Sequence, residues 1–299
     1  MKNLNNKELN SYLKNQIRIN YKLNQNSWFG IGGTASTFFQ PNTKQDLKFF
    51  LKNTKSKKIF CIGSGSNILF KDQGFDGVIV KLGKGFLKIE ENNCSIRAGA
   101  AALKSKVSDF AQKLGLCNFE FLSAIPGTVG GGVFMNAGCF GNEFANIIDE
   151  IIVIDFHGEE HKIKKKDILF SYRKSGIPKS FIIIEVIFKK TQMQMPDLIR
   201  KKINSYKEQK KINQPGNIKT GGSTFKNPLE HNIKAWELIR KYDCDKLIFG
   251  NAKFSSHHCN FIDNSNLASS EDIERLIKKT QEIILKKSGI KLELEIDIV

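Results

Sequence analysis

Two hydrophobic patterns alternate along the chain. Apolar residues that alternate with polar ones, or that run consecutively between glycine turns, predict strands. Such runs occupy 27–41, 58–82, 150–165, 180–190 and 291–299, with further strand-like sequence up to 263. Apolar residues spaced three or four apart predict helices, here near 43–53, 197–211, 232–241 and 270–288, after a short polar helix at the N-terminus. This interleaving is typical of an α+β protein.

Two further segments carry signals for where helices begin and end. Residues 95–116 combine a strand with an amphipathic helix that stops at Gly115. The helix near 270–288 begins behind Ser269 and Ser270, and Gly289 follows it. Serine is a favoured N-cap and glycine the usual residue just after a helix, so we expect both ends to lie at these positions.

The size of the chain predicts more than one domain. At 299 residues it exceeds what a single hydrophobic core comfortably supports. Glycine is concentrated before residue 140, and the composition shifts near the polar helix at 197–211. We therefore expect a second domain after about residue 200.

The overall composition is that of a soluble enzyme. Hydrophobic residues make up 40% of the chain and charged residues 26%, as in ordinary globular domains. The N-terminus lacks the apolar core of a signal peptide, and the longest apolar runs, such as 181–184, are strand-sized. Six cysteines occur without C-x-x-C spacing, which favours reduced thiols. These features predict a cytoplasmic protein.

The net charge of +17 leaves a nucleic-acid-binding module as an alternative. The densest basic clusters, 162–167 and 199–211, lack the interleaved aromatic residues on which bases stack. Solvated helix or hairpin faces explain such clusters better. A positive field would also favour small anionic substrates.

Three familiar motifs match only in part. The segment GSGSNI, 63–68, has Ile68 where a dinucleotide fingerprint needs its third glycine. The segment GNIKTGGS, 216–223, has Gly222 where a P-loop needs its lysine. The segment HGEEH, 157–161, fits a zinc pattern that requires a helix, whereas its flanks are strand-like. We therefore expect a hairpin turn at 157–161 and no metal site.

Two glycine-rich elements remain, GSGSN at 63–67 and IPGTVGGG at 125–132. The second belongs to the stretch 122–141, where six of twenty residues are glycine. Tight turns explain either element alone, but small residues with free amides also form anion-binding nests. Together they favour a large flat ligand with a pyrophosphate, and a flavin dinucleotide fits that description.

Eight blocks of sequence, in order, resemble the UDP-N-acetylenolpyruvoylglucosamine reductase family of bacterial peptidoglycan precursor synthesis. They are SWFGIGG (27–33), IGSGSNILF (62–70), GFDGVIVKL (74–82), LSAIPGTVGGGVFMNAGCFG (122–141), FSYRKS (170–175), GGSTFKNP (221–228), HHCNFIDN (257–264) and LELEI (292–296). The resemblance implies an α+β protein with the vanillyl-alcohol-oxidase/PCMH-type FAD-binding fold of two lobes plus a substrate-binding α+β domain. The expected bounds are 1–82 with the strand 291–299, then 83–195, then 196–290.

The resemblance also implies a reaction and its residues. The family uses NADPH and non-covalent FAD to reduce the enolpyruvyl group of a UDP-sugar to UDP-N-acetylmuramate. Arg173 matches the family arginine that stabilises the enolate-like intermediate, Ser223 the serine that protonates it, and Glu295 the assisting carboxylate. Glu293 lies on the same strand face, and the resemblance alone separates the two glutamates.

Further residues are expected at the cofactor and substrate by position in the matched blocks. Predicted FAD contacts are Gly63, Ser64, Gly65, Ser66, Asn67, Ser123, Ile125, Pro126, Gly127, Thr128, Gly130, Gly131, Asn136, Ala137 and Gly138. Predicted substrate contacts are Tyr172, Lys226 and Asn227. At Gly130 and Gly131 we expect positive φ and close approach of the cofactor, so that valine would abolish FAD retention.

The expected partners are small molecules, the UDP-sugar and NADPH, with no nucleic acid, no membrane and a monomeric state. The interval between Arg173 and Ser223 offers no inserted segment with a tyrosine to close over the substrate, which predicts the shorter of the family's two types. A different oxidase of the same flavin fold remains an alternative, although it would not share SYRKS, GGSTFKNP and LELEI together.

Overall fold

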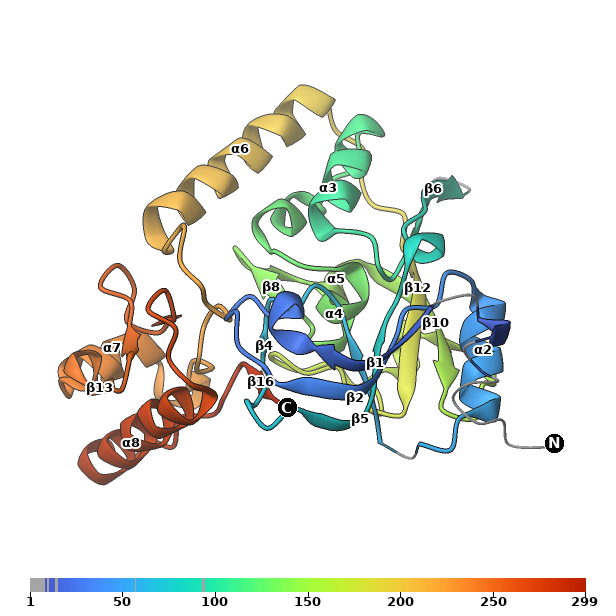
Figure 1. Ribbon diagram of the computed structural model, residues 1–299. Coiled ribbons are helices and arrows are strands. Elements are labelled where there is room, and N and C mark those ends of the chain that lie inside the picture. Colours follow the sequence, from blue (N-terminus) through green and yellow to red (C-terminus); the bar gives the residue numbers. More distant parts are fainter. Residues whose placement is uncertain (1–8, 10, 14–15, 57, 93–94) are drawn as a thin grey trace. The chain divides into compact units, whose positions relative to one another are not determined.

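A computed structural model describes the chain except residues 1–8, 10, 14–15, 57 and 93–94 (Figure 1). The expected N-terminal helix lies largely outside the described residues. The chain divides into two compact units. Unit 1 comprises 1–20, 36–64 and 76–210, and unit 2 comprises 21–35, 65–75 and 211–299. Both contain helices and strands, so the predicted α+β class is confirmed.

A five-stranded sheet with strand order β11-β10-β12-β7-β6 forms the centre of unit 1. Its strands are β6 (Ile89–Asn92), β7 (Ser95–Gly99), β10 (Ile148–Asp155), β11 (Glu160–Lys164) and β12 (Phe181–Phe188). All neighbouring pairs are antiparallel. The predicted hairpin at 150–165 and the strand at 180–190 are therefore confirmed.

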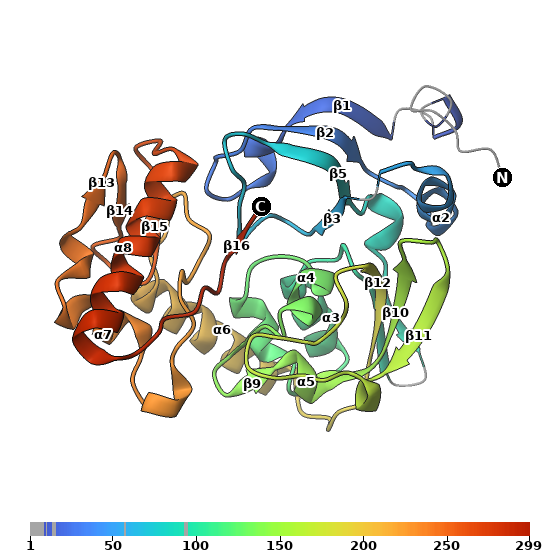
Figure 2. The ribbon, with the colours of Figure 1, turned by 90° about the horizontal axis from the view of Figure 1, so that it is seen from below.

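Alternating side chains of β10 contribute to two cores, as the strand period of two requires. Ile151 and Val153 belong to one core, with helices α3 (Lys104–Lys113), α4 (Val129–Phe134) and α5 (Phe144–Ile147) (Figure 2). Ile152 and Ile154 belong to the other, with α2 (Lys44–Asn53). The glycine-rich α4 is thus fixed against a sheet face.

A second sheet has the order β1-β2-β5-β3, in which β3 and β5 run parallel. Its strands are β1 (Ile17–Lys22), β2 (Thr34–Phe39), β3 (Ile59–Ile62) and β5 (Phe75–Lys81). The GSGSN element follows β3 directly. Helix α2 begins at a capping box between Thr43 and Asp46, which accounts for the helix predicted at 43–53.

Unit 2 has its own core, built from α7 (Ala235–Lys241) and α8 (Ser270–Ser288) and from a sheet of order β13-β14-β15. These strands are β13 (Ile248–Phe249), β14 (Ala252–Phe254) and β15 (Ile262–Asp263). A parallel pair joins β4 (Ile68–Leu69) to β16 (Asp297–Ile298). Ser269 caps α8 and Gly289 follows it at φ 72°, as predicted.

The remaining elements connect these layers. They are the helix α6 (Pro196–Asn213), the short pair β8 (Gly138–Cys139) and β9 (Asn142–Glu143), and the 3-10 turns η1 (Leu23–Asn26), η2 (Lys84–Phe86), η3 (Glu120–Ala124), η4 (Lys165–Asp167), η5 (Leu229–His231) and η6 (Cys244–Lys246).

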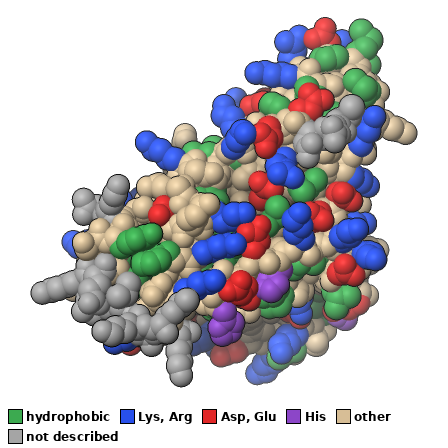
Figure 3. Space-filling view, turned by 90° about the vertical axis from the view of Figure 1, so that its right-hand side faces the viewer, with side chains coloured by type: hydrophobic (Ala, Val, Ile, Leu, Met, Phe, Trp, Pro, Cys, Tyr) green, Lys and Arg blue, Asp and Glu red, His purple; other side chains and the backbone are tan. Residues whose placement is uncertain are grey.

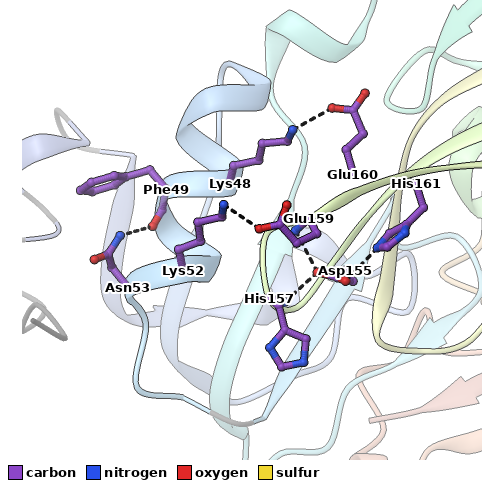
Figure 4. Close-up of polar contacts among 9 residues, drawn as sticks. All are labelled: Lys48, Phe49, Lys52, Asn53, Asp155, His157, Glu159, Glu160 and His161. Carbon is purple, nitrogen blue, oxygen red and sulfur yellow. Dashed lines mark hydrogen bonds and ion pairs between the residues drawn. The ribbon is translucent and has the colours of Figure 1, made fainter. Parts of the chain in front are cut away.

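The HGEEH segment is a hairpin turn between β10 and β11, as expected (Figure 4). The Asp155 carboxylate accepts hydrogen bonds from the amides of His157 and Glu159 and lies 2.8 Å from Nε2 of His161. Gly158 closes the turn at φ 81°. Among the described residues, no group of three or more His, Cys, Asp and Glu could hold a metal ion.

The distribution of surface charge weakens the nucleic-acid alternative. On the face in Figure 3, lysine and arginine side chains are interspersed with aspartate and glutamate. Such mixing is typical of a solvated surface rather than of a basic stripe. The five cysteines that the structure describes are free thiols. Among the described helices, none has the length and apolar character needed to cross a membrane.

Candidate active site

The core of the glycine-rich stretch is a short helix rather than an open loop. Thr128 caps α4, and its Oγ1 accepts from the Gly131 amide at 3.4 Å. The amides of Val129 and Gly130 donate to the carbonyls of Ala102 and Ala100 at 2.8 and 2.9 Å. These bonds hold the start of α4 against the chain that follows β7.

The expectation of positive φ at Gly130 and Gly131 is wrong. Both residues lie inside α4, and the left-handed backbone occurs at Gly127 instead, with φ 103°. Gly127 makes the turn that precedes α4, so the residues after Thr128 can adopt regular helical angles. Glycine at 130 and 131 therefore has to be explained by space and not by backbone angle.

Three successive glycines of α4 have different surroundings. A Cβ on Gly130 would lie 2.9 Å from the Ala100 Cβ, and one on Gly132 would collide with the Phe144 ring. A Cβ on Gly131 would approach only Thr128 Oγ1, at 3.4 Å, and this residue is exposed. The protein itself excludes side chains at the first and third positions. At Gly131 the space is open, as it must be where a flat ligand approaches backbone.

The two glycine elements meet within unit 1. A Cβ on Gly63 would collide with Thr128 Oγ1, the atom that caps α4. Next to it, the Ser64 Oγ is buried and has no hydrogen-bond partner in the described structure. A buried hydroxyl without a partner is costly. A phosphate oxygen accepts hydrogen bonds, so a cradle in which the Ser64 hydroxyl lies next to Gly63 and Thr128 fits the pyrophosphate of a dinucleotide.

The rest of GSGSN lies in unit 2 and supports a catalytic candidate. A side chain on Gly65, at φ 72°, would collide with the Asn26 carbonyl. The Asn67 Nδ2 donates to the Glu295 carbonyl at 2.9 Å, and the Asp297 amide donates to the Asn67 carbonyl at 3.0 Å. Asn67 therefore fixes the chain on both sides of Ile296. The Ser66 carbonyl lies 4.0 Å from the position a Cβ would take on Gly222.

Ser223 and Glu295 are brought close together by backbone bonds in unit 2. The Glu295 amide donates to the Thr224 carbonyl at 2.9 Å. The Thr224 amide donates to the Asn260 carbonyl at 2.7 Å, and the Asn260 side chain bonds both the amide and the carbonyl of Phe225. Asn260 is 4% exposed. It is a supporting residue that the sequence did not single out, although it lies in the matched block HHCNFIDN.

The structure distinguishes the two glutamates of LELEI. The side chain of Glu293 is 68% exposed and pairs with Lys226 Nζ at 3.3 Å. Glu295 is less exposed and lies beside Thr224. This supports Glu295 as the candidate carboxylate. Of the predicted substrate contacts, Lys226 is engaged with Glu293, and Asn227 Oδ1 accepts from the first amide of α7 at 3.0 Å.

Arg173 lies in a strained turn of unit 1, with φ 55°. The Ser175 hydroxyl donates to the Phe134 carbonyl at 2.7 Å, and the Asn136 Nδ2 donates to the Ser171 carbonyl at 2.9 Å. The guanidinium carbon of Arg173 lies 5.0 Å from the ring centroid of Tyr172. Strain of this kind persists where the surroundings impose it and is common at functional sites. The turn is thus tied to the C-terminal end of α4.

Several predicted FAD contacts also form hydrogen bonds or packing contacts within unit 1. The fully buried Asn136 uses its Oδ1 to accept from the Ala145 amide and its Nδ2 to bond Ser171. The Ser123 hydroxyl donates to the Glu120 carbonyl at 2.7 Å. A side chain on Gly138 would collide with the neighbouring strand β9. Ile125 and Ala137 pack partly against the core, and Pro126 is exposed.

Comparisons with known proteins agree with this geometry. A family model described as an FAD binding domain matches residues 35–164. A model described as UDP-N-acetylenolpyruvoylglucosamine reductase, C-terminal domain, matches residues 214–299. The fold and the glycine cradle, with the first match, define an FAD-dependent oxidoreductase.

Whole-chain relatives narrow the class to one family. The UDP-N-acetylenolpyruvoylglucosamine reductase of Pelagibacter ubique (strain HTCC1062) is 40% identical over 296 residues, 98% of each chain. That of Rickettsia rickettsii (strain Sheila Smith) is 39% identical over 95% of this chain and 96% of its own. A crystal structure of the reductase from Thermus caldophilus has a TM-score of 0.80 at 28% identity, covering 94% of this chain and 97% of that one. The chain belongs to the UDP-N-acetylenolpyruvoylglucosamine reductase family.

Proposed function

We propose that this protein reduces the enolpyruvyl group of a UDP-N-acetylglucosamine enolpyruvate to UDP-N-acetylmuramate, with NADPH as the reductant, for peptidoglycan precursor synthesis. The observation that carries the proposal is the 2.9 Å bond from the Glu295 amide to the carbonyl of Thr224, the residue that follows Ser223. Both residues match family motifs, and the fold holds them by backbone bonds.

The residues of the glycine cradle would hold FAD. Gly63 and the Ser64 hydroxyl would face the pyrophosphate, and the open position at Gly131 would admit the flat part of the cofactor. When bound, FAD supplies the hydride transfer between NADPH and the enolpyruvyl double bond. We propose non-covalent attachment.

Three side chains would handle the charge and the proton that follow. Hydride addition to one carbon of the double bond places negative charge on the neighbouring carbon and its carboxylate. The fixed guanidinium of Arg173 would stabilise that charge, because arginine stays protonated and presents several donors. The Ser223 hydroxyl would deliver the proton, and Glu295 would assist next to it. Serine is a weak acid, so it suits only a strongly basic carbanion.

We further propose the shorter family type, a cytoplasmic location and a monomeric state. Between Arg173 and Ser223 the described chain contains β12, α6 and connecting loops. Tyr206 of α6 stacks on Phe140, with ring centroids 4.2 Å apart, and so belongs to the packing of unit 1.

Purified protein tests the proposal directly. It should be yellow, release about one FAD per chain into the supernatant on acid precipitation, and oxidise NADPH when the enolpyruvyl substrate is present. Mass spectrometry should detect UDP-N-acetylmuramate. Glu295→Gln should lose turnover, whereas Glu293→Gln, an exposed neighbour, should keep it. A colourless protein, flavin retained in the acid pellet, or no product would reject the proposal.

A further inference from the structure

A cavity of about 400 Å³ lies on the five-stranded sheet of unit 1. All five strands contribute to its lining, together with Lys44 of α2 and Phe86 of η2. None of the described residues that line it belongs to the glycine cradle, to α4 or to the turn that holds Arg173. A volume of this size is typical of small-molecule sites. The cavity is therefore a candidate binding site outside the one described above.

A β-bulge in β12 directs two neighbouring side chains into this cavity. The register of β12 against β10 shifts where Ile152 lies opposite Glu185. Ile184 is the extra residue, and its carbonyl accepts from the Ala100 amide at 3.0 Å. Ile184 and Glu185 both line the cavity, although successive side chains of a regular strand face opposite sides of a sheet. The bulge thus places a carboxylate beside the buried apolar side chains of Ile152 and Ile184, and bulges often redirect side chains in this way next to functional sites.

The carboxylate of Glu185 forms an ion pair with Arg97 that lacks a hydrogen bond. Arg97 Nε and Glu185 Oε1 lie 3.5 Å apart, and in the described structure both atoms are buried without a hydrogen-bond partner. The two side chains as a whole remain 34% and 28% exposed. Burial raises the pKa of Glu185, and the charge of Arg97 only partly offsets this. A further positive group beside the carboxylate and a further acceptor beside the guanidinium would stabilise both.

The other acidic side chains of the cavity already have partners. Glu160 pairs with Lys44 at 2.9 Å, and Glu90 pairs with Lys88. Lys162 of β11 also lines the cavity, and within the described part of the chain its ammonium makes no ion pair or hydrogen bond. The cavity thus offers a ligand this ammonium and the ion pair that lacks a hydrogen bond.

We propose that this cavity binds an α-amino acid with an apolar side chain. The ligand carboxylate would accept hydrogen bonds from Arg97 and Lys162, and its ammonium would donate to Glu185. Its side chain would lie on Ile152 and Ile184. An α-amino acid has both charged groups on one carbon, which suits an acidic and a basic group whose atoms lie 3.5 Å apart.

The charges of the cavity disfavour other classes of ligand. Three of its side chains are carboxylates, which would repel a polyanion such as a nucleotide. Four are cationic, which would repel a ligand with positive charge alone. The site needs neither FAD nor the UDP-sugar, so the assignment does not rest on the proposed function.

Calorimetry on the full-length protein tests the assignment, with L-leucine, L-methionine and L-phenylalanine as probes. At least one should bind with a Kd on the order of 1 mM or lower, as expected for a ligand of about ten non-hydrogen atoms. The amide of that amino acid lacks the carboxylate, and its N-acetyl derivative lacks the ammonium. Each derivative should bind at least ~10-fold more weakly, because each loses hydrogen bonds between charged groups.

Variants locate the binding. Glu185→Gln and Arg97→Met should each weaken it at least ~10-fold, the scale of one hydrogen bond to a charged group. Glu91→Gln is the matched control, because Glu91 is an exposed glutamate of β6 that does not line the cavity. Circular dichroism checks folding. Lys162→Met, at an exposed position, should also weaken binding and carries the test if one of the other variants does not fold.

Three outcomes would overturn the assignment. They are no binding of any of the three amino acids at about 20 mM, binding that is unchanged in the Glu185 and Arg97 variants, and equal binding of the amide and N-acetyl derivatives. None of these measurements uses turnover of the enolpyruvyl substrate. Failure here would therefore leave the proposed function standing, and failure of the proposed function would leave this site unaffected.

Discussion

The two units hold their candidate residues in opposite ways. In unit 1, side chains are absent at Gly63 and along α4, and the buried Ser64 hydroxyl has no hydrogen-bond partner in the described structure. In unit 2, backbone bonds to Asn67 and Asn260 lock Ser223 and Glu295 in place. Unit 1 thus leaves space and a hydrogen-bond donor for a ligand, and unit 2 fixes the backbone of the candidate proton donor, Ser223.

This difference has an energetic reason. A hydroxyl acting as a general acid must be placed within hydrogen-bond reach of one atom, which a rigid backbone ladder achieves. A large cofactor instead needs open space and polar groups that are not yet hydrogen-bonded. Burying such groups costs free energy until the ligand is bound. The substitutions below test each half of the contrast, from the largest expected effect to the smallest.

Gly131→Val should abolish FAD retention while the protein still folds. The position is open in the protein, so a branched side chain would meet the cofactor rather than the core. Flavin absorbance after gel filtration measures retention, and circular dichroism measures folding. Gly216→Val is the control, because a Cβ there meets nothing within 4 Å. Full flavin occupancy in Gly131→Val would show that this glycine has no contact with the cofactor.

Ser223→Ala should separate the two half-reactions. Oxidation of NADPH does not need the hydroxyl, so flavin reduction should be nearly unchanged. Reoxidation by the enolpyruvyl substrate should slow at least ~100-fold, the usual scale for loss of a positioned general acid. Stopped-flow absorbance follows each half in turn. Equal slowing of both halves would indicate general damage, and no slowing of the second would remove Ser223 from proton transfer.

Asn260→Ala should weaken unit 2 and the geometry of Ser223 together. The change leaves the buried amide and carbonyl of Phe225 without partners, at a cost of about 1–3 kcal/mol. Urea unfolding should show the loss, with slower substrate-dependent reoxidation of the flavin. Asn251→Ala, in the exposed β13–β14 turn, is the matched control. A stable, fully active Asn260→Ala would mean that the 224–225 backbone is held by other contacts.

The sequence predicted regular elements well because their signals are local. The capping residues of α2 and α8 and the alternation in β10 and β12 each act within a few positions. Helix α4 was missed because VGGGVF has poor helix propensity. Its bonds to Ala100 and Ala102, some thirty residues away, override that propensity.

Only those residues of the candidate site that lie in matched sequence motifs could be predicted. The matched blocks contained Ser223, Glu295 and Arg173, but strand periodicity could not separate Glu293 from Glu295. The exposed ion pair of Glu293 with Lys226 favours Glu295, whose role stays a prediction. The burial of Lys104, which is 5% exposed, could not have been predicted from the sequence, since lysine is almost never fully buried. Its burial depends on α4 covering it, a tertiary fact that no local pattern contains.

The smallest expected effect lies far from both regions of the contrast, at Asp155. Burial raises the pKa of Asp155, but hydrogen bonds from His161, Glu159 and His157 outweigh it and leave the pKa below its ordinary value. Such a carboxylate stabilises the fold above its unfolded pKa, and the contribution is lost as pH falls through the folded pKa. Asp155→Asn should therefore lower the free energy of unfolding by about 1 kcal/mol at pH 7.

The same measurement at low pH sharpens this expectation. Once the pH is below the lowered pKa of Asp155, the wild-type carboxyl is protonated, so the difference between wild type and Asp155→Asn should disappear. Flavin content should not change at any pH at which the protein is folded. A difference that persists in acid would show that packing, rather than charge, accounts for the effect.

The bond from Asn67 to the Glu295 carbonyl joins positions 228 residues apart. A ribosome adding roughly 5–20 residues per second makes Asn67 tens of seconds or less before its partner, with most of unit 1 synthesised in between. During that interval the 65–75 segment has none of its final neighbours from 211–299. Ser223 and Glu295, the candidate proton donor and carboxylate, are therefore synthesised last, after all the residues of unit 1 have been made.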